Sequence, residues 1–238
     1  SAWVRDFGPQ FIVDGDDDGA SQTVLDFAYE QPRPRDDALP AYLSERWHRS
    51  RVDVPLVHGG GNIHVFSNGD AFASEILLSQ NRNVARWRLA SAMLALADLR
   101  LALYPASPQE FDRTGHIDMW FQPVADDEVL IGRYEPTETE PHRISELAAA
   151  DLADRGYTVH RTPGWRSWGV HYTYTNALIF NNLVFMPVYK RYRQQNREAH
   201  SVFKRAFPGR TIIPVDCSRP VASGGALHCL GLSNPMKP

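Results

Sequence analysis

Short apolar runs and alternating apolar and polar positions dominate the chain, and four longer segments have helical spacing instead. Side chains of a half-buried strand alternate between core and solvent, whereas one face of a helix recurs every three to four residues. The first pattern predicts strands at residues 3–13, 23–29, 52–57, 63–66, 71–74, 99–104, 119–124, 128–134, 157–162 and 211–216, and two more within 171–189. The second predicts helices at residues 38–49, 84–98, 137–154 and 194–207.

The order of hairpin, helix and strand recurs with a period of about 50 residues. Such a period indicates an internal repeat, in which one small sheet and its helix form a unit. The chain would hold some four of these units, so the sequence predicts an α/β fold. In the second predicted helix, Trp87, Ala90, Met93, Leu94 and Ala97 share one face, and we expect this face to pack in the core.

The composition is that of an ordinary globular protein, because 43% of the 238 residues are hydrophobic. A net charge of −3 gives no reason to expect a nucleic-acid partner. No apolar run reaches the ~20 residues that a membrane helix needs, so we expect no membrane span. Cys217 and Cys229 allow at most one disulfide, and their spacing is not that of a disulfide scaffold.

An acidic, glycine-bounded segment at residues 14–19 follows the first predicted strand. Its carboxylates could in principle coordinate calcium, but the segment lacks the glutamate that closes a calcium-binding loop. A solvated hairpin turn is the interpretation that we favour.

Cys229, which follows Gly224 and Gly225, is the residue best suited to act as a nucleophile. A thiol reacts as the thiolate, at an unperturbed pKa of about 8.5, so it needs a histidine or a cation nearby. His116 and Asp118 are the best candidates, because side chains two apart in an extended segment point the same way. Taken singly, a buried cysteine is usually inert packing and a His-x-Asp pair usually lies on the surface.

His228 is next to Cys229 in the sequence. We disfavour it as the catalytic base, because neighbours along an extended chain point to opposite faces.

Five motifs occur in one order along nearly the whole chain. They are Trp-x-Arg-Asp-x-Gly-Pro from Trp3 to Pro9, three glycines before Asn62, Gly-His-x-Asp around His116, Tyr-x-Asn ending at Asn176, and Gly-Gly-x-x-x-Cys ending at Cys229. Each motif alone is weak. In this order they resemble the guanidine-group-modifying penteins, most closely the bacterial peptidylarginine deiminases of the porphyromonad type, with the agmatine deiminases next.

The resemblance implies a five-bladed α/β propeller with its site on the axis, of which this chain would lack the first repeat. Residues 1–238 would then be a single deiminase catalytic domain, truncated on its N-terminal side. The partner would be a separate N-terminal fragment or further copies of this chain in a homo-oligomer. The compartment stays open: secreted if a signal sequence preceded residue 1, and cytoplasmic otherwise.

The resemblance also implies roles for five catalytic residues. Asp6 and Asp118 would clamp the planar guanidinium, since each carboxylate can accept two N–H bonds from it. Cys229 would attack the guanidinium carbon, and His116 would supply and take up protons. Asn176 would orient the nucleophile or the intermediate. The chemistry needs no cofactor and no metal.

Two further residues would contact the substrate. Trp3 matches an aromatic position that packs along the aliphatic stem of arginine, although a core tryptophan is an equal alternative. The glycines before Asn62 would let the backbone approach whatever fills the site. Relatives often carry glutamate where this chain has His58, so His58 either tunes substrate choice or is a satisfied histidine at a strand end.

Arg33 and Arg35 lie in a proline-rich segment, residues 31–37, that we expect to be extended. Two guanidinium groups on a stiff backbone would form a fork for a carboxylate. In porphyromonad enzymes a similar element receives the carboxylate of a C-terminal arginine. The ordinary alternative is that both arginines pair with the neighbouring aspartates.

Three functions follow from these residues. The first is a peptidylarginine deiminase, which converts peptide arginine, C-terminal arginine included, to citrulline and ammonia. The second is an agmatine deiminase, whose substrate has no carboxylate and whose product is N-carbamoylputrescine. The third is a non-catalytic pentein that binds a partner, which would have no reason to keep the five catalytic residues together.

Overall fold

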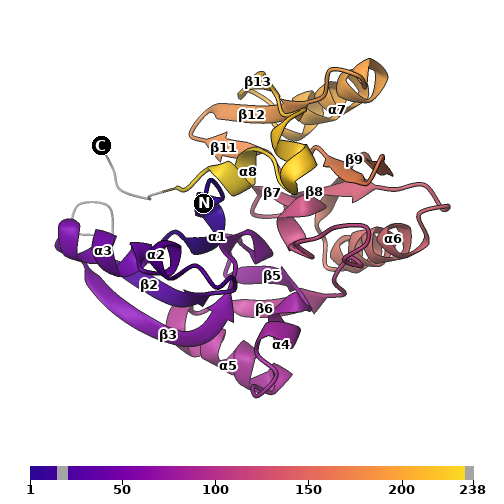
Figure 1. Cartoon of the computed structure of the whole chain (residues 1–238). Coiled ribbons are helices and arrows are strands. Elements are labelled where there is room, and N and C mark those ends of the chain that lie inside the picture. The colour runs from indigo at the N-terminus through magenta and orange to yellow at the C-terminus, as the bar shows by residue number, and fades with distance from the viewer. Residues whose placement is uncertain (15–20, 234–238) are drawn as a thin grey trace.

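The structure, a computed structural model, describes residues 1–14 and 21–233. These residues form four small sheets that follow one another along the chain (Figure 1). Each sheet begins with an antiparallel hairpin, and its second strand then pairs in parallel with the third. One or two helices connect each parallel pair. The predicted repeat of hairpin, helix and strand is therefore confirmed.

The bounds of the elements are as follows. The first sheet contains β1 (Gln10–Asp14), β2 (Ser21–Tyr29) and β3 (Ser50–His58), and the second contains β4 (Ile63–Val65), β5 (Asp70–Ser74) and β6 (Arg100–Tyr104). The third contains β7 (Phe121–Ala125), β8 (Glu128–Arg133), β9 (Thr158–Ser167) and β10 (Val170–Thr173), and the fourth contains β11 (Leu178–Phe180), β12 (Leu183–Val188) and β13 (Thr211–Asp216). The connecting helices are α2 (Pro34–Asp37), α3 (Leu39–Arg46), α4 (Ile76–Gln80), α5 (Arg86–Ala97), α6 (Thr139–Asp154) and α7 (Arg193–Ala206).

The core lies between each sheet and its helices. On α6, Ile144, Ala148 and Leu152 recur every four residues and are fully buried in the cluster that contains β8. Val129 and Ile131 of β8 are also completely buried, because this strand has neighbours on both sides. The sheets are thereby held rigidly, and their strand ends can position side chains.

Four short helices lie at strand ends and pack on one another. They are α1 (Val4–Phe7), η1 (Gly60–Asn62), η2 (Ile117–Met119) and α8 (Leu227–Leu230). Helix α1 contacts both α8 and η1, and η1 contacts η2. In Figure 1, α1 and α8 lie together in the middle of the molecule although they come from opposite ends of the chain.

Three local predictions were wrong near these short helices. The strand expected at 3–13 starts only at Gln10, because α1 precedes it and Gly8-Pro9 separates the two. Residues 31–37 are not extended throughout, since Pro34 begins α2, a position where its fixed φ fits a helix. The pair at 116 and 118 lies in a 3-10 turn and not in a strand.

Two other corrections concern α5 and the end of the third unit. Trp87 and Leu94 are 65% and 50% exposed, and the buried face of α5 carries Leu89 and Met93. The face was misassigned because α5 is apolar nearly all round. Within 171–189 the structure has three strands in place of two, and Asn181 makes the turn between β11 and β12 with a positive φ of 52°.

The acidic segment at 14–19 lies outside the described residues from residue 15 onward, so its expected turn stays a prediction. Over the described ranges 1–14 and 21–233, every helix is too short or too polar to cross a bilayer.

Candidate active site

Three of the short helices and the segment after β10 bring all five predicted catalytic residues to one place. Asp6 comes from α1, His116 and Asp118 from the turn at η2, and Cys229 from α8. Asn176 follows β10 and is completely buried. Residues from both ends of the chain thus meet where the sheets converge.

Gly61 shows how closely three of these side chains approach. A Cβ atom on Gly61 would lie 2.9 Å from Asp118 Oδ2, from Asp6 Oδ1 and from His116 Nδ1. Contacts this short are not tolerated, so only glycine fits between the two carboxylates and the imidazole. The backbone N–H of Gly61 instead donates a hydrogen bond of 3.3 Å to Asp6 Oδ1.

Its neighbours in the glycine triplet are constrained in the same way. A Cβ on Gly60 would lie 2.0 Å from the carbonyl oxygen of Arg5, and one on Gly59 would lie 2.7 Å from the His116 ring. The triplet therefore lets α1 and η2 pack directly against the backbone between β3 and β4.

Cys229 is almost completely buried, and two side chains contact its sulfur. The amide Nδ2 of Asn176 donates to Sγ at 3.1 Å, and Asp118 Oδ2 accepts from the thiol at 3.3 Å. Asn176 Oδ1 accepts from the backbone N–H of Ala226 at 2.8 Å and from that of Cys229 at 3.4 Å. Asn176 therefore fixes both the sulfur and the segment that carries it.

The thiol of Cys229 is protonated in the absence of substrate. Burial is the main cause that raises its pKa well above the usual range, and the negative charges of Asp118 and Asp6 add to the effect. The thiol will ionise only when a positive charge enters the site and offsets these carboxylates.

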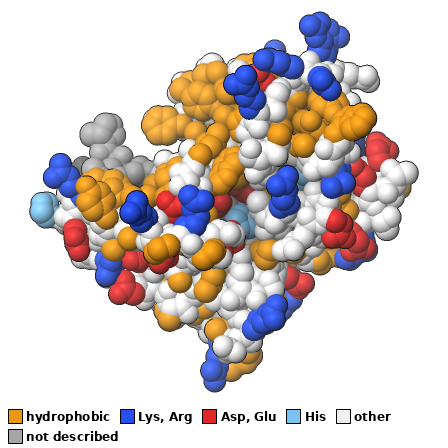
Figure 2. Space-filling model, in the orientation of Figure 1, with side chains coloured by type: hydrophobic (Ala, Val, Ile, Leu, Met, Phe, Trp, Pro, Cys, Tyr) orange, Lys and Arg blue, Asp and Glu red, His pale blue; other side chains and the backbone are white. Residues whose placement is uncertain are grey.

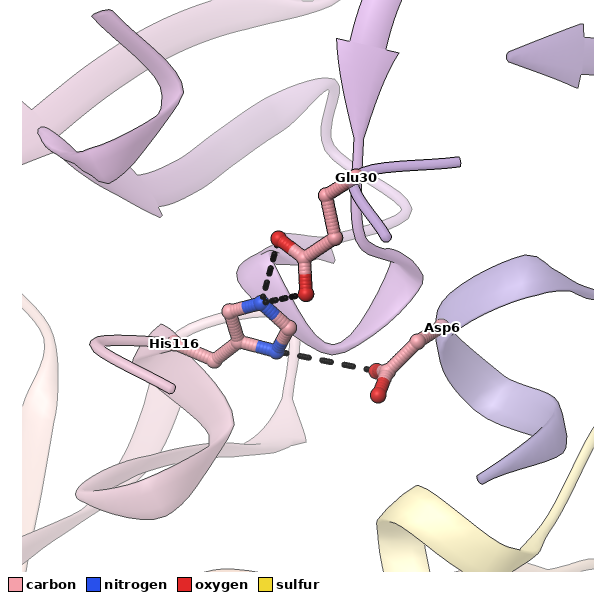
Figure 3. Close-up of side chains that lie close together, drawn as sticks. All are labelled: Asp6, Glu30 and His116. Carbon is pink, nitrogen blue, oxygen red and sulfur yellow. Dashed lines mark hydrogen bonds and ion pairs between the residues drawn. The ribbon is translucent and has the colours of Figure 1, made fainter. Parts of the chain in front are cut away.

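His116 lies between two carboxylates (Figure 3). Its Nε2 is 3.1 and 3.2 Å from the two carboxylate oxygens of Glu30, and its Nδ1 is 3.6 Å from Asp6 Oδ1. Burial alone would lower the pKa of His116, but the hydrogen bond to Glu30 and the charge of Asp6 raise it to about 10. The ring is therefore an imidazolium at neutral pH and can donate a proton.

The two aspartates differ in charge state. Burial raises the pKa of Asp6 to about 7, against the opposing effect of His116. Burial also acts to raise the pKa of Asp118, but a hydrogen bond from His228 and the positive charge of His116 hold that pKa below its usual range. Asp118 Oδ1 is buried and accepts no hydrogen bond from the described residues. This oxygen is free to receive an N–H donor.

A cavity of about 430 Å³ leads to this cluster. Asp6 and Glu30 lie in its wall together with Trp3, Arg33 and Arg113. Figure 2 shows acidic and histidine side chains in the middle of the molecular face, beside lysine or arginine side chains. A cationic group of modest size could therefore enter and meet the carboxylates of Asp6 and Glu30.

Asn62, Arg33 and Arg35 were also predicted to bind substrate, and each has a different environment in the structure. Asn62 is completely buried, and its Oδ1 accepts from the backbone N–H groups of Ser74 and Ile117 at 3.1 Å. Arg33 lines the cavity, but its Nε donates to Asp36 Oδ2 at 2.5 Å. Arg35 is exposed in the last turn of α2 and does not line the cavity.

Trp3 lies where its motif places it, half-buried in the cavity wall. Its ring atom Cζ3 would lie 3.0 Å from a Cβ on Gly225, and the Cys229 sulfur would lie 2.9 Å from the same Cβ. The indole and the thiol therefore flank Gly225. His58 is buried at the end of β3. Its Nε2 is 2.9 Å from the side-chain nitrogen of Gln10, and its Nδ1 has no hydrogen-bond partner among the described residues.

The sequence motifs missed two residues of the site. Glu30 follows β2 directly, and β2 pairs in parallel with β3, which ends at the glycine triplet. Carboxyl ends of parallel strands meet at one edge, and this signal could have identified Glu30. His228 was misplaced because residues 227–230 were taken as extended, whereas they form α8.

Asp6, Glu30 and His116 also have the residue types of a metal site, with ligand atoms within 4.8 Å of one another. A metal needs the free lone pair of a neutral imidazole, whereas the carboxylates keep His116 protonated. The set is better suited to a cation that carries N–H donors.

Residues 1–235 match the protein family described as Porphyromonas-type peptidyl-arginine deiminase. An agmatine deiminase of Pseudomonas putida is 25% identical over 98% of this chain and 74% of its own length. The C. jejuni agmatine deiminase with substrate bound superimposes with a TM-score of 0.82, at 21% identity over 95% of this chain and 71% of that one.

A Porphyromonas gingivalis crystal structure superimposes with a TM-score of 0.85, at 21% identity over 99% of this chain and 75% of that one. The α/β pentein prediction is therefore confirmed. The chain belongs to the Porphyromonas-type peptidyl-arginine deiminase family, and it is a hydrolase of amidine carbon–nitrogen bonds.

Proposed function

We propose that this chain is an agmatine deiminase, which hydrolyses the guanidinium of agmatine to N-carbamoylputrescine and ammonia. One observation carries the proposal: the free Oδ1 of Asp118 lies in the cluster where Asp6, His116 and the Cys229 sulfur converge. Relatives over nearly the whole chain are agmatine deiminases, which favours this substrate over peptidyl arginine.

In the proposed mechanism, the guanidinium enters the cavity and donates N–H bonds to Asp6 and Asp118. Its positive charge offsets the two carboxylates that keep the Cys229 thiol protonated. The thiol proton passes to Asp118 Oδ2 at 3.3 Å, and the sulfur then bonds to the guanidinium carbon. Two carboxylates hold the planar group, so the carbon is positioned for attack.

The tetrahedral adduct then loses one nitrogen. His116 donates a proton to that nitrogen, which leaves as ammonia, and a cysteinyl thiouronium remains. The now neutral His116 takes a proton from water as the water oxygen bonds to the carbon. The carbon–sulfur bond breaks, Asp118 returns the thiol proton to the departing sulfur, and the remaining hydroxyl proton of the adduct leaves to solvent. The product is a urea, which is uncharged and is no longer held by the carboxylates.

Asn176 and Asn62 have supporting roles in this proposal. Asn176 holds the sulfur, while Asn62 fixes the backbone of Ile117 and thereby the turn that carries His116 and Asp118. The predicted contact between Asn62 and substrate is replaced by this positioning role, because its Oδ1 accepts two backbone N–H groups and its Nδ2 donates to the Ser74 carbonyl.

Peptides with a C-terminal arginine are the second candidate substrate. Arg33 and Arg113 line the cavity, and Arg113 forms no ion pair with a described residue, so a carboxylate could bind there. Two observations weaken the carboxylate fork: Asp36 already engages Arg33, and Arg35 lies outside the cavity wall.

Incubation with agmatine, free arginine, and peptides with internal or C-terminal arginine tests both readings. We expect ammonia release and a mass gain of about one dalton with agmatine, lost by at least about a thousandfold in Cys229→Ala. Cys217→Ala is the matched control, because Cys217 is equally buried but lies away from the carboxylates. Turnover of only the C-terminal peptide would select the second candidate, and activity retained in Cys229→Ala would refute the mechanism.

A further inference from the structure

His228 contacts the carboxylate that is central to the proposed reaction. Its Nδ1 lies 2.8 Å from Asp118 Oδ2, and the side chain is only 10% exposed. The contact exists because α8 turns the backbone, so that consecutive residues His228 and Cys229 both reach Asp118. Its backbone carbonyl accepts a hydrogen bond from Arg5 Nε at 3.4 Å, which ties α8 to α1.

The two oxygens of Asp118 are used differently. Oδ2 accepts from both His228 and the thiol of Cys229, whereas Oδ1 has no donor among the described residues. A carboxylate held through one oxygen cannot rotate freely, so its second oxygen keeps a fixed direction. That second oxygen is the one left for an N–H group of the substrate.

The groups around His228 fix its charge. Arg5, His64 and His116 are the cationic or titratable neighbours, and Asp118 is the acid that it contacts. Burial first, and then the charge of Arg5, lower the pKa of His228, while Asp118 opposes them. The ring is therefore neutral at physiological pH, and its Nδ1–H donates the hydrogen bond to Asp118 Oδ2.

We propose that His228 is a positioning residue, which keeps Asp118 ionised and aims its Oδ1 at the guanidinium. This assignment rests on the proposed function, in which Asp118 binds the guanidinium of the substrate. It goes beyond the clamp itself, since it explains how a fully buried aspartate can be a carboxylate before substrate binds and can then accept the proton of Cys229.

Three variants test the role of the Nδ1 donor. The amide of asparagine can replace Nδ1 of histidine, whereas that of glutamine replaces Nε2, so His228→Asn should retain the hydrogen bond and His228→Gln and His228→Ala should lose it. His171→Asn is the control, because His171 is equally buried but contacts Tyr134 and not Asp118.

The quantity to measure is kcat/KM as a function of pH, on the acidic side of the profile. In the wild type only Asp6 titrates there, near its pKa of about 7, so log(kcat/KM) should rise with slope one. Without the His228 donor, Asp118 also binds a proton, and the slope should approach two with the limb moved up by about one pH unit. His228→Asn and His171→Asn should keep the wild-type limb.

A second readout needs no substrate turnover. A haloacetamidine alkylates Cys229 only where a carboxylate holds its amidinium, so its rate against pH, followed by intact mass, should show the same shift. Wild-type protein that alkylates but does not turn over agmatine would count against the proposed function alone. Identical limbs in His228→Gln, His228→Ala and wild type would overturn the role of His228, as would a shift in His171→Asn of the same size.

Discussion

His116 and His228 are two buried histidines of the candidate site, and they differ in charge: the first is a cation and the second is neutral. His116 lies between the carboxylates of Glu30 and Asp6, and its pKa is raised to about 10. His228 contacts one carboxylate, Asp118, and is neutral because burial and the nearby cation of Arg5 lower its pKa.

The difference shows that burial alone does not set the charge of a histidine. Both rings lose hydration, which favours the neutral form, and the outcome depends on the number and position of charged neighbours. The protonated ring of His116 can donate a proton, whereas the neutral ring of His228 holds Asp118 by a hydrogen bond.

Replacing the protonated histidine should have the largest effect. In His116→Gln the side chain can no longer donate a full proton to the leaving nitrogen, so we expect kcat to fall by roughly 10²–10⁴-fold. The substrate should still bind, because Asp6 and Asp118 remain. Steady-state kinetics and substrate binding by calorimetry check this, and a variant with unchanged kcat would remove His116 from the chemistry.

Removing only the carboxylate that keeps this ring charged should have a smaller effect. In Glu30→Gln the pKa of His116 should fall, and the basic limb of kcat, near pH 10 in the wild type, should move to lower pH. We expect a loss of about 10–100-fold at pH 8. A pH profile of kcat measures the shift.

Glu140→Gln is the matched control for Glu30→Gln, since Glu140 pairs with Arg143 on the exposed surface of α6. Its pH profile should be that of the wild type. An unmoved basic limb in Glu30→Gln would show that Asp6 alone keeps the ring protonated.

The repeat could be predicted from the sequence because each unit has its own local pattern. The predicted helices at 137–154 and 194–207 correspond to α6 and α7 within a few residues, since a polar face opposes each apolar stripe. In α5, apolar residues occur nearly all round the helix, so the sequence could not show that Trp87 and Leu94 face solvent. The buried stripe is selected by contacts made in the fold, with β6 and with the cluster of Leu25, Val54 and Ala73 that surrounds Leu89.

The parts of the site that depend on motifs could be placed, and those that depend on topology could not. Asp6, His116, Asp118, Asn176 and Cys229 each belong to a recognisable motif, and the structure brings them together. Glu30 has no motif, and it reaches His116 only because β2 and β3 are parallel neighbours. A contact between residues 86 positions apart in sequence is set by the fold.

The smallest of these effects is the titration of Asp6 in the wild-type protein. Its pKa lies near 7 because burial disfavours its charged form, and only that form can bind a guanidinium as an ion pair. kcat/KM should therefore rise about tenfold per pH unit below pH 7 and level off above it. His116 stays protonated until about pH 10, so this limb belongs to the carboxylate. A flat kcat/KM between pH 5.5 and 8 would mean that Asp6 is already ionised, and that His116 interacts with two full negative charges rather than one.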